Sequence, residues 1–324
     1  MALTYIIDTP DYDKNIGGIC ALHYLADCLL NLGAVDVYLT ADKVNSRWKS
    51  KTISKETPFF LGNDLLDHFY LSLNILKKYV FFNTFKRKIN RFQNKLFAKL
   101  LWRHFDKEKT VVICPEILKG TPLQAKNVVR WVMNTPGVCG GDGVFGANEH
   151  IFLYHTWFNV NKTYDVKGVL TAIDLDHQLK TFVDEKLPTR KGGAYLIRKG
   201  QFKKHNQHPD DFVKADNLLS KMTDEEASKF FNSIEKFISY DDMTFITVQA
   251  ALCGCQVVII PGHGDRSKES LKKSNPIFGV AYGFDDEEWA SSTINMLRGD
   301  FQRQNHENLA TVRNFYEYCE NTFG

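Results

Sequence analysis

Short apolar runs rich in β-branched residues recur along the chain, and between them apolar residues fall at helical spacing. The runs that predict strands lie at 3–7, 35–39, 110–114, 150–154, 169–172, 194–197, 237–240, 256–261 and 277–282. Helices are expected over about 19–31, 242–252 and 305–322. Strands that alternate with helices in this way predict an α/β protein built on parallel sheets.

Two further helix starts are predicted from capping patterns. Residues 121–124, TPLQ, combine an N-cap threonine, a proline at the first helical position and a glutamine that closes a capping box. We expect the helix that they open to end before Pro136. Residues 223–226, TDEE, form a second capping box, which opens a helix leading into the strand at 237–240.

The length of 324 residues accommodates two domains of ordinary size. The charged segment 184–191 is the expected linker between them. We therefore expect an N-terminal domain over 1–187, a C-terminal domain over 188–304, and a terminal helix over 305–324 that crosses back to the first domain.

A segment at 59–109 differs from the rest in composition, and we expect it to be a helical insertion in the first domain. Between Lys77 and Lys109 there are 11 Lys or Arg and two acids, a net of +9, whereas the whole chain is only +3. On a helix, two faces would form, an apolar one and a basic one. The apolar face comprises Phe85, Ile89, Phe92, Leu96 and Leu100, and the basic i,i+4 row comprises Arg87, Arg91, Lys95, Lys99 and Arg103.

Like charges at that spacing destabilise an isolated helix, so an anionic partner is expected to face the row. Three interpretations of the segment remain open. A basic amphipathic helix can lie on an anionic membrane or contact an acceptor there, it can bind nucleic acid, or it can pack on its own domain with solvated charges. We favour peripheral membrane contact through residues 77–109 and expect no nucleic-acid partner.

The composition of the whole chain is that of an ordinary globular protein, with 44% hydrophobic and 24% charged residues. The seven cysteines are scattered and lie mostly in apolar stretches, which favours reduced, packed thiols and argues against a cysteine-bound metal. The sequence shows no signal peptide and no apolar run long enough to span a membrane. We expect a cytoplasmic protein, located at the inner face of the membrane if the basic segment binds lipid.

The segment 237–262 carries the most informative chemistry. Its predicted strand, helix and strand form a βαβ unit, and ligands of open α/β sheets bind beyond the carboxyl ends of such strands. Ser239, Tyr240, Asp241 and Asp242 follow the first strand, next to the exposed amides of a helix start, which suit a phosphate group.

This segment resembles the donor site of GT-B glycosyltransferases, in particular the retaining family 4 type of bacterial surface-polysaccharide biosynthesis. The matching positions are Ser239, Asp241, Gln249, Ala250, Cys253, Gly254 and Val257–Ile259. Asp241 stands where the family usually has Glu, and Gln249 replaces the Glu that usually holds the nucleotide ribose. The resemblance implies two Rossmann-like domains that face a cleft, with the nucleotide-sugar bound by the C-terminal domain.

On the donor side, the resemblance implies that Arg198 and Lys199 hold the diphosphate, with help from backbone amides near Met243 and Thr244. Asp241, beside Tyr240 at the strand end, would hold the hydroxyls of the donor sugar. Gln249 would hydrogen-bond the ribose.

On the acceptor side, Gly17 and Gly18 match the glycine-rich turn of the N-terminal domain in this family. Glu116 follows the strand at 110–114 and could orient an acceptor hydroxyl or take its proton. His155, at the end of another strand, could reach the donor sugar. Each feature is also compatible with a purely structural role: the glycines with a tight turn, the glutamate with a loop position, and the histidine with a hydrogen bond at the strand end.

The resemblance therefore implies a metal-independent transfer of a sugar, from a nucleotide-sugar that serves as co-substrate, to a hydroxyl of a glycan or lipid-linked acceptor. Two other functions stay open, an oxidoreductase or other nucleotide-dependent enzyme and a non-catalytic scaffold at the membrane surface. The absence of a third glycine at the required spacing after Gly17-Gly18 argues against a dinucleotide fingerprint.

Overall fold

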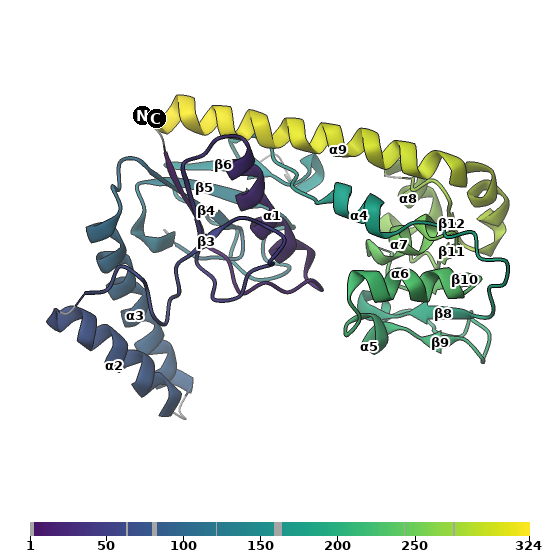
Figure 1. The fold of residues 1–324 in the computed structure, drawn as a ribbon, viewed down its shortest axis with the longest axis horizontal. Coiled ribbons are helices and arrows are strands. Elements are labelled where there is room, and N and C mark those ends of the chain that lie inside the picture. Colours follow the sequence, from purple (N-terminus) through teal and green to yellow (C-terminus); the bar gives the residue numbers. More distant parts are fainter. Residues whose placement is uncertain are drawn as a thin grey trace. The chain divides into compact units, whose positions relative to one another are not determined.

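The computed structural model describes residues 3–62, 64–79, 83–120, 122–158, 164–242, 244–274 and 276–324. The chain divides into two compact units, the first comprising 1–173 with 307–324 and the second comprising 174–306. Each unit is built on a parallel sheet with helices, which confirms the α/β class expected from the sequence (Figure 1).

The first unit contains a seven-stranded sheet in the order β3-β2-β1-β4-β5-β6-β7. The strands are β1 Thr4–Ile7, β2 Asp36–Leu39, β3 Lys51–Thr52, β4 Thr110–Pro115, β5 Asn127–Val132, β6 Glu149–Leu153 and β7 Val166–Val169. The helices are α1 Gly17–Asn31, α2 Leu65–Tyr79 and α3 Asn83–His104. The last part of α9 Glu287–Phe323 also belongs to this unit.

Successive side chains of β1 enter two different cores, because strand side chains alternate between the faces of a sheet. Tyr5 and Ile7 join the core that includes α1 and Phe315 of α9. Ile6 joins the core that includes Tyr70 of α2 and Phe97 of α3. Burial on both faces explains why the strands read as continuous apolar runs rather than as alternating ones.

The prediction of a helix starting at residues 121–124 is wrong. Thr121 lies outside the described residues, and a single 3-10 turn, Pro122–Gln124, is followed by strand β5. Leu123 and Gln124 have φ of 51° and 53°, so the backbone leaves the helical region at once. The apolar run from Val128 to Val132 is instead buried between β4 and β6.

The second unit contains a five-stranded sheet in the order β12-β11-β10-β8-β9. The strands are β8 Gly193–Leu196, β9 Val213–Lys214, β10 Lys236–Ser239, β11 Gln256–Ile259 and β12 Val280–Tyr282. The helices are α4 Leu175–Thr181, α5 Asp216–Leu219, α6 Asp224–Ser233, α7 Ile246–Leu252, α8 Lys268–Ser274 and the first part of α9.

Helix α6 begins where the sequence predicted. The Thr223 side chain accepts from the Glu226 amide, and the Glu226 carboxylate accepts from the Thr223 amide, which confirms the capping box. Helix α7 begins later than expected, at Ile246 rather than near Asp242, and the expected terminal helix is the end of a single 37-residue helix, α9.

The charged segment 184–191 lies inside the second unit. The Arg190 guanidinium donates to Asp184 Oδ1 at 2.6 Å and to the Cys253 carbonyl at 2.7 Å. The Glu185 amide donates to Asn232 of α6 at 2.8 Å. Because these bonds attach the segment to α6 and to the end of α7, the unit begins at Asp174 instead of at residue 188.

Within the described residues, no helix combines the length and the apolar character that crossing a membrane requires.

Candidate functional site

The strand order of the second sheet reverses between β8 and β10. From β8 the sheet continues to β9, and from β10 it continues to β11 and β12. In open α/β sheets, ligands bind outside the carboxyl ends of the strands at such a switch point. The segments 197–200, 240–242 and 260–263, which follow β8, β10 and β11, therefore form the ligand edge of the second unit.

Two cations converge on one carboxylate at this edge. The Lys203 ammonium donates to Asp242 Oδ2 at 2.8 Å and to the Ile260 carbonyl at 2.7 Å. Arg266 Nη1 approaches the other oxygen of Asp242 at 3.2 Å. Hydrogen bonds between ionised groups are the strong ones in proteins, so these contacts hold the Lys203 ammonium at the edge.

Sequence reasoning missed Lys203 and Arg266. Lys203 belongs to the basic run 198–204, RKGQFKK, of which only Arg198 and Lys199 were predicted to bind phosphate. Lys203 reaches the ends of β10 and β11 because of the turn that follows β8, and the basic run itself does not indicate that turn.

Close backbone contact holds this turn against β10. A Cβ atom on Gly200 would lie 2.1 Å from the Tyr240 carbonyl oxygen, so only glycine fits there. Arg198 has a positive φ of 36°, and its amide donates to Asp216 Oδ1 at 2.8 Å. The side chains of Arg198 and Lys199 are exposed at the ligand edge, where the sequence placed them.

Tyr240 and Asp241 are both buried at the end of β10. The Tyr240 hydroxyl accepts from the Gln207 amide and bonds His208 Nδ1, each at 2.9 Å, and burial raises the pKa of Tyr240. Its ring belongs to the core of the second unit. The Asp241 carbonyl accepts from the Ser239 hydroxyl at 2.7 Å, which fixes the backbone at the strand end.

Thr244 precedes helix α7, and Gln249 lies on it. The Thr244 carbonyl accepts from the Thr247 hydroxyl at 2.8 Å. Gln249 Nε2 donates to Gln178 Oε1 of α4 at 2.8 Å, so a ribose would have to compete with this amide pair. Met243 lies outside the described residues.

The first sheet has its own switch point, between β1 and β4. A buried polar cluster that the sequence did not reveal lies there. Asp8 Oδ1 accepts from the Thr40 hydroxyl at 2.8 Å and from the Lys55 ammonium at 2.6 Å. The Thr9 amide donates to the same Thr40 hydroxyl at 3.1 Å. These contacts join the ends of β1 and β2 with the segment after β3.

Glu116 directly follows β4, at the carboxyl edge of the same sheet, and is only 4% exposed. Its Oε2 accepts from the Met133 amide at 3.0 Å, at the end of β5. Burial raises the pKa of this carboxyl. A buried carboxyl with a raised pKa is suited to accept and return a proton near neutral pH.

Gly17 and Gly18 are the first residues of α1, rather than part of the preceding loop. Ile16, the N-cap residue, provides no side-chain hydrogen bond. His155 is exposed after the end of β6 and stacks on the ring of Trp157, with centroids 3.4 Å apart. Desolvation of the imidazole lowers the pKa of His155.

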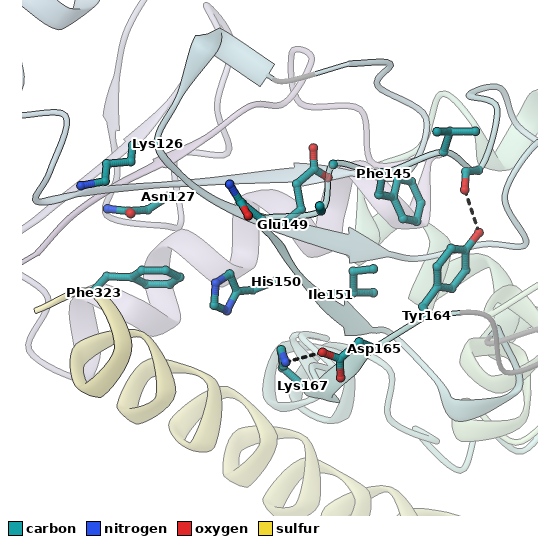
Figure 2. A pocket seen from close by; sticks show the side chains of 15 residues that line it. Lys126, Asn127, Phe145, Glu149, His150, Ile151, Tyr164, Asp165, Lys167 and Phe323 are labelled. Atoms are coloured by element: carbon teal, nitrogen blue, oxygen red, sulfur yellow. Dashed lines mark hydrogen bonds and ion pairs between the residues drawn. The ribbon is translucent and has the colours of Figure 1, made fainter.

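A hollow of about 970 Å³ lies at the opposite, amino-terminal edge of the first sheet, away from these residues. Figure 2 shows the rings of His150 and Phe323 beside each other in this hollow, with Asp165 paired to Lys167. Two further charged residues that line the hollow form ion pairs: Glu149 with Arg130, and Lys126 with Glu108.

Among the residues that the structure covers, no three His, Cys, Asp or Glu side chains form a group that could hold a metal ion.

No protein-family model matches this chain, and no curated protein shows significant similarity to it. Function is therefore inferred from the two switch points and from the resemblance of residues 237–262.

Proposed function

We propose that this protein is a GT-B glycosyltransferase that transfers a sugar from a nucleotide-sugar to a hydroxyl of a glycan or lipid-linked acceptor. The observation that carries the proposal is the set of cations at the switch point of the second sheet, where Lys203 and Arg266 share the Asp242 carboxylate. A nucleoside diphosphate is an anionic ligand for which such a site is suited.

In this proposal, the diphosphate displaces Asp242 from Lys203 and Arg266. Arg198 and Lys199, exposed on the turn after β8, add a guanidinium fork and a second ammonium group. These cations stabilise the negative charge that develops on the departing nucleoside diphosphate, which is the largest electrostatic demand of the reaction. The proposed transfer needs no metal ion, because the side chains supply the positive charge.

Other residues hold the remaining parts of the donor. Asp241, at the end of β10, binds hydroxyls of the donor sugar. Gln249 hydrogen-bonds the ribose after its amide leaves Gln178. Thr244 contributes its backbone amide beside the phosphates. Tyr240 acts through its backbone, since its hydroxyl is already bonded to Gln207 and His208.

The first unit binds the acceptor in this proposal. Glu116 takes the proton of the acceptor hydroxyl, a role that its raised pKa supports. The amides of Gly17 and Gly18, at the start of α1, bind an oxygen of the acceptor. His155 contacts the sugar that is transferred. The GT-B arrangement, in which two Rossmann-like domains face a cleft, would bring these groups to the donor.

A thermal-shift panel with UDP, GDP, CMP, TDP and NADH tests the proposal. A ligand that binds only the folded protein adds about 2.7 kcal/mol of stability at 100 times its dissociation constant. We expect one nucleoside diphosphate to raise the melting temperature. Lys203→Gln should lose that rise, whereas Lys221→Gln, which removes an exposed lysine from the same unit, should keep it. A rise with none of the diphosphates, or an equal rise in both variants, would contradict the donor site.

One observation favours a second candidate, an NAD-dependent oxidoreductase. The order β3-β2-β1-β4-β5-β6 in the first sheet is the order of dinucleotide-binding domains. A rise with NADH alone in the same panel would support this candidate over the glycosyltransferase.

A further inference from the structure

Helices α2 and α3 form an antiparallel pair on one face of the first sheet (Figure 1). Three contacts define the pairing: Asp64 with Arg103, Phe69 with Phe92, and Asn74 with Gln93. Asp64, just before α2, contacts Arg103 near the end of α3, whereas Phe69 and Asn74, further along, contact Phe92 and Gln93 nearer its start, so the two helices run in opposite directions. The inner sides of both helices are buried in the core that also contains strands β1, β2 and β4.

The outer side of α3 carries a row of exposed residues. Phe92, Lys95, Lys99 and Arg103 follow one another at spacings of three, four and four, so they lie on one face of the helix. All four are exposed. Of the residues predicted for the apolar face, Ile89, Leu96 and Leu100 are buried, whereas Phe92 is exposed and lies with the basic row, so its expected place on the apolar face is wrong. The side chains of Phe85, Arg87 and Arg91 lie outside the described part.

Apolar side chains are exposed next to this basic row. The Phe69 ring of α2 meets the Phe92 ring edge to face, with centroids 6.0 Å apart, and the two residues are 46% and 51% exposed. Leu65, one turn before Phe69 on α2, is 84% exposed. Contiguous exposed apolar groups are uncommon on a surface that faces only water, and they mark interaction sites.

The charge of this face is strongly one-sided. Helix α3 contains no acidic residue along its 22 positions. Arg103 is paired with Asp64 at 2.8 Å, but for Lys95 and Lys99 no ion pair occurs among the residues that the structure describes. Two lysines one turn apart therefore present positive charge beside exposed Phe92.

A merely solvated face would explain the lysines but not the exposed Phe69, Phe92 and Leu65. Nucleic acid would use ring faces for stacking on bases, yet Phe69 and Phe92 contact each other edge to face, and Leu65 offers no ring. A bilayer interface accepts aliphatic and aromatic side chains alike, while lysines bind the phosphates of the headgroups.

We propose that the outer face of α2 and α3, defined by Leu65, Phe69, Phe92, Lys95 and Lys99, binds the surface of a membrane that contains anionic lipid. The apolar side chains enter the boundary between headgroups and acyl chains, and the lysines bind lipid phosphates. This surface is independent of the proposed donor site, since it lies in the first unit and involves none of the donor-site residues.

Vesicle co-sedimentation tests the proposal with the full chain. Vesicles of phosphatidylcholine with 30 mol% phosphatidylglycerol would be compared with vesicles of phosphatidylcholine alone, at low and at high salt. Each lysine near an anionic surface contributes about 1 kcal/mol, so Lys95→Gln with Lys99→Gln should weaken partitioning about 30-fold. The control, Lys221→Gln with Lys229→Gln, removes two exposed lysines from the second unit and should partition like the parent.

The apolar half of the face requires its own variant. Phe69→Ser should reduce binding to the anionic vesicles at high salt as well as at low salt, because the lost contribution is hydrophobic rather than electrostatic. Melting curves followed by circular dichroism would show that each variant is folded.

Three results would overturn the proposal. They are no binding of the parent to anionic vesicles at low salt, equal binding to neutral vesicles, and unchanged binding of the double variant at 95 and 99. Binding of a single-stranded oligonucleotide without binding to vesicles would instead assign the face to nucleic acid.

Discussion

The carboxyl edges of the two sheets differ in what they bury and in what they expose. In the first unit, Asp8 is buried, with Thr40 and Lys55 bonded to it, and Glu116 is buried with a raised pKa. In the second unit, the side chains of Arg198 and Lys199 are exposed. Lys203 and Arg266 both bond the carboxylate of Asp242.

This difference suggests that the carboxyl edges of the two parallel sheets have different chemical roles. A buried carboxyl is suited to proton transfer, because burial brings its pKa closer to neutrality. Clustered cations are suited to binding an anionic leaving group. Under the proposed function, the first edge would take the proton of the acceptor hydroxyl and the second would bind the nucleoside diphosphate.

The largest expected effect tests the acidic edge. Glu116→Gln keeps the size of the side chain but removes the base, so the turnover rate should fall about 10²- to 10⁴-fold. Nucleotide binding should stay unchanged, because Glu116 lies in the first unit. Turnover and calorimetric affinity would be measured on the same preparation, with Glu56→Gln, an exposed glutamate, as control. Equal turnover in the parent and Glu116→Gln would remove Glu116 from the mechanism.

A smaller effect tests how the basic edge is built. A Cβ on Gly200 would overlap the Tyr240 carbonyl, so Gly200→Ala should lower the free energy of unfolding by about 1–3 kcal/mol and weaken nucleotide binding. At Gly17 no atom lies within 4 Å of such a Cβ, so Gly17→Ala should stabilise α1 slightly. Urea denaturation measures both. Equal stability of the two variants would show that the close approach at Gly200 is unimportant.

The smallest effect is a pH dependence at the acidic edge. The raised pKa of Glu116 means that the folded protein holds this proton more tightly than the unfolded chain. The resulting stability is fully present below the unfolded pKa, near 4.5, and is lost as pH rises through the folded value. Relative to Glu116→Gln, the parent should therefore become less stable as pH rises through this window. A parallel pH profile of unfolding free energy in the two proteins would contradict the raised pKa.

Much of the fold could be predicted from the sequence, because β1, β4, β8, β10 and β11 are short apolar runs between clear helix or turn signals. Strand β5 could not. Arg130 interrupts its apolar run and makes it resemble an amphipathic helix, yet this side chain is buried in a bidentate pair with Glu149 at 2.8 and 3.0 Å. The partner lies on the next strand, so local spacing does not reveal it.

The candidate sites were predictable only in part. The positions of Glu116, Arg198 and Lys199 at strand ends follow from the pattern of apolar runs. Lys203 and the cluster around Asp8 depend on how turns bring side chains from different strands together, which periodicity does not determine. The two-residue strands β3 and β9 carry no sequence signal of their own.

Calorimetric titration of the stabilising nucleoside diphosphate tests the central claim most directly. The parent would be compared with Arg198→Ala/Lys199→Ala and with a control in the same unit, Lys221→Ala/Lys229→Ala. Because each charged hydrogen bond contributes about 1.5–3 kcal/mol, the first double variant should bind at least about 100-fold more weakly, and the control should bind like the parent. Equal affinity of all three proteins would contradict the assignment of the basic edge as the diphosphate site.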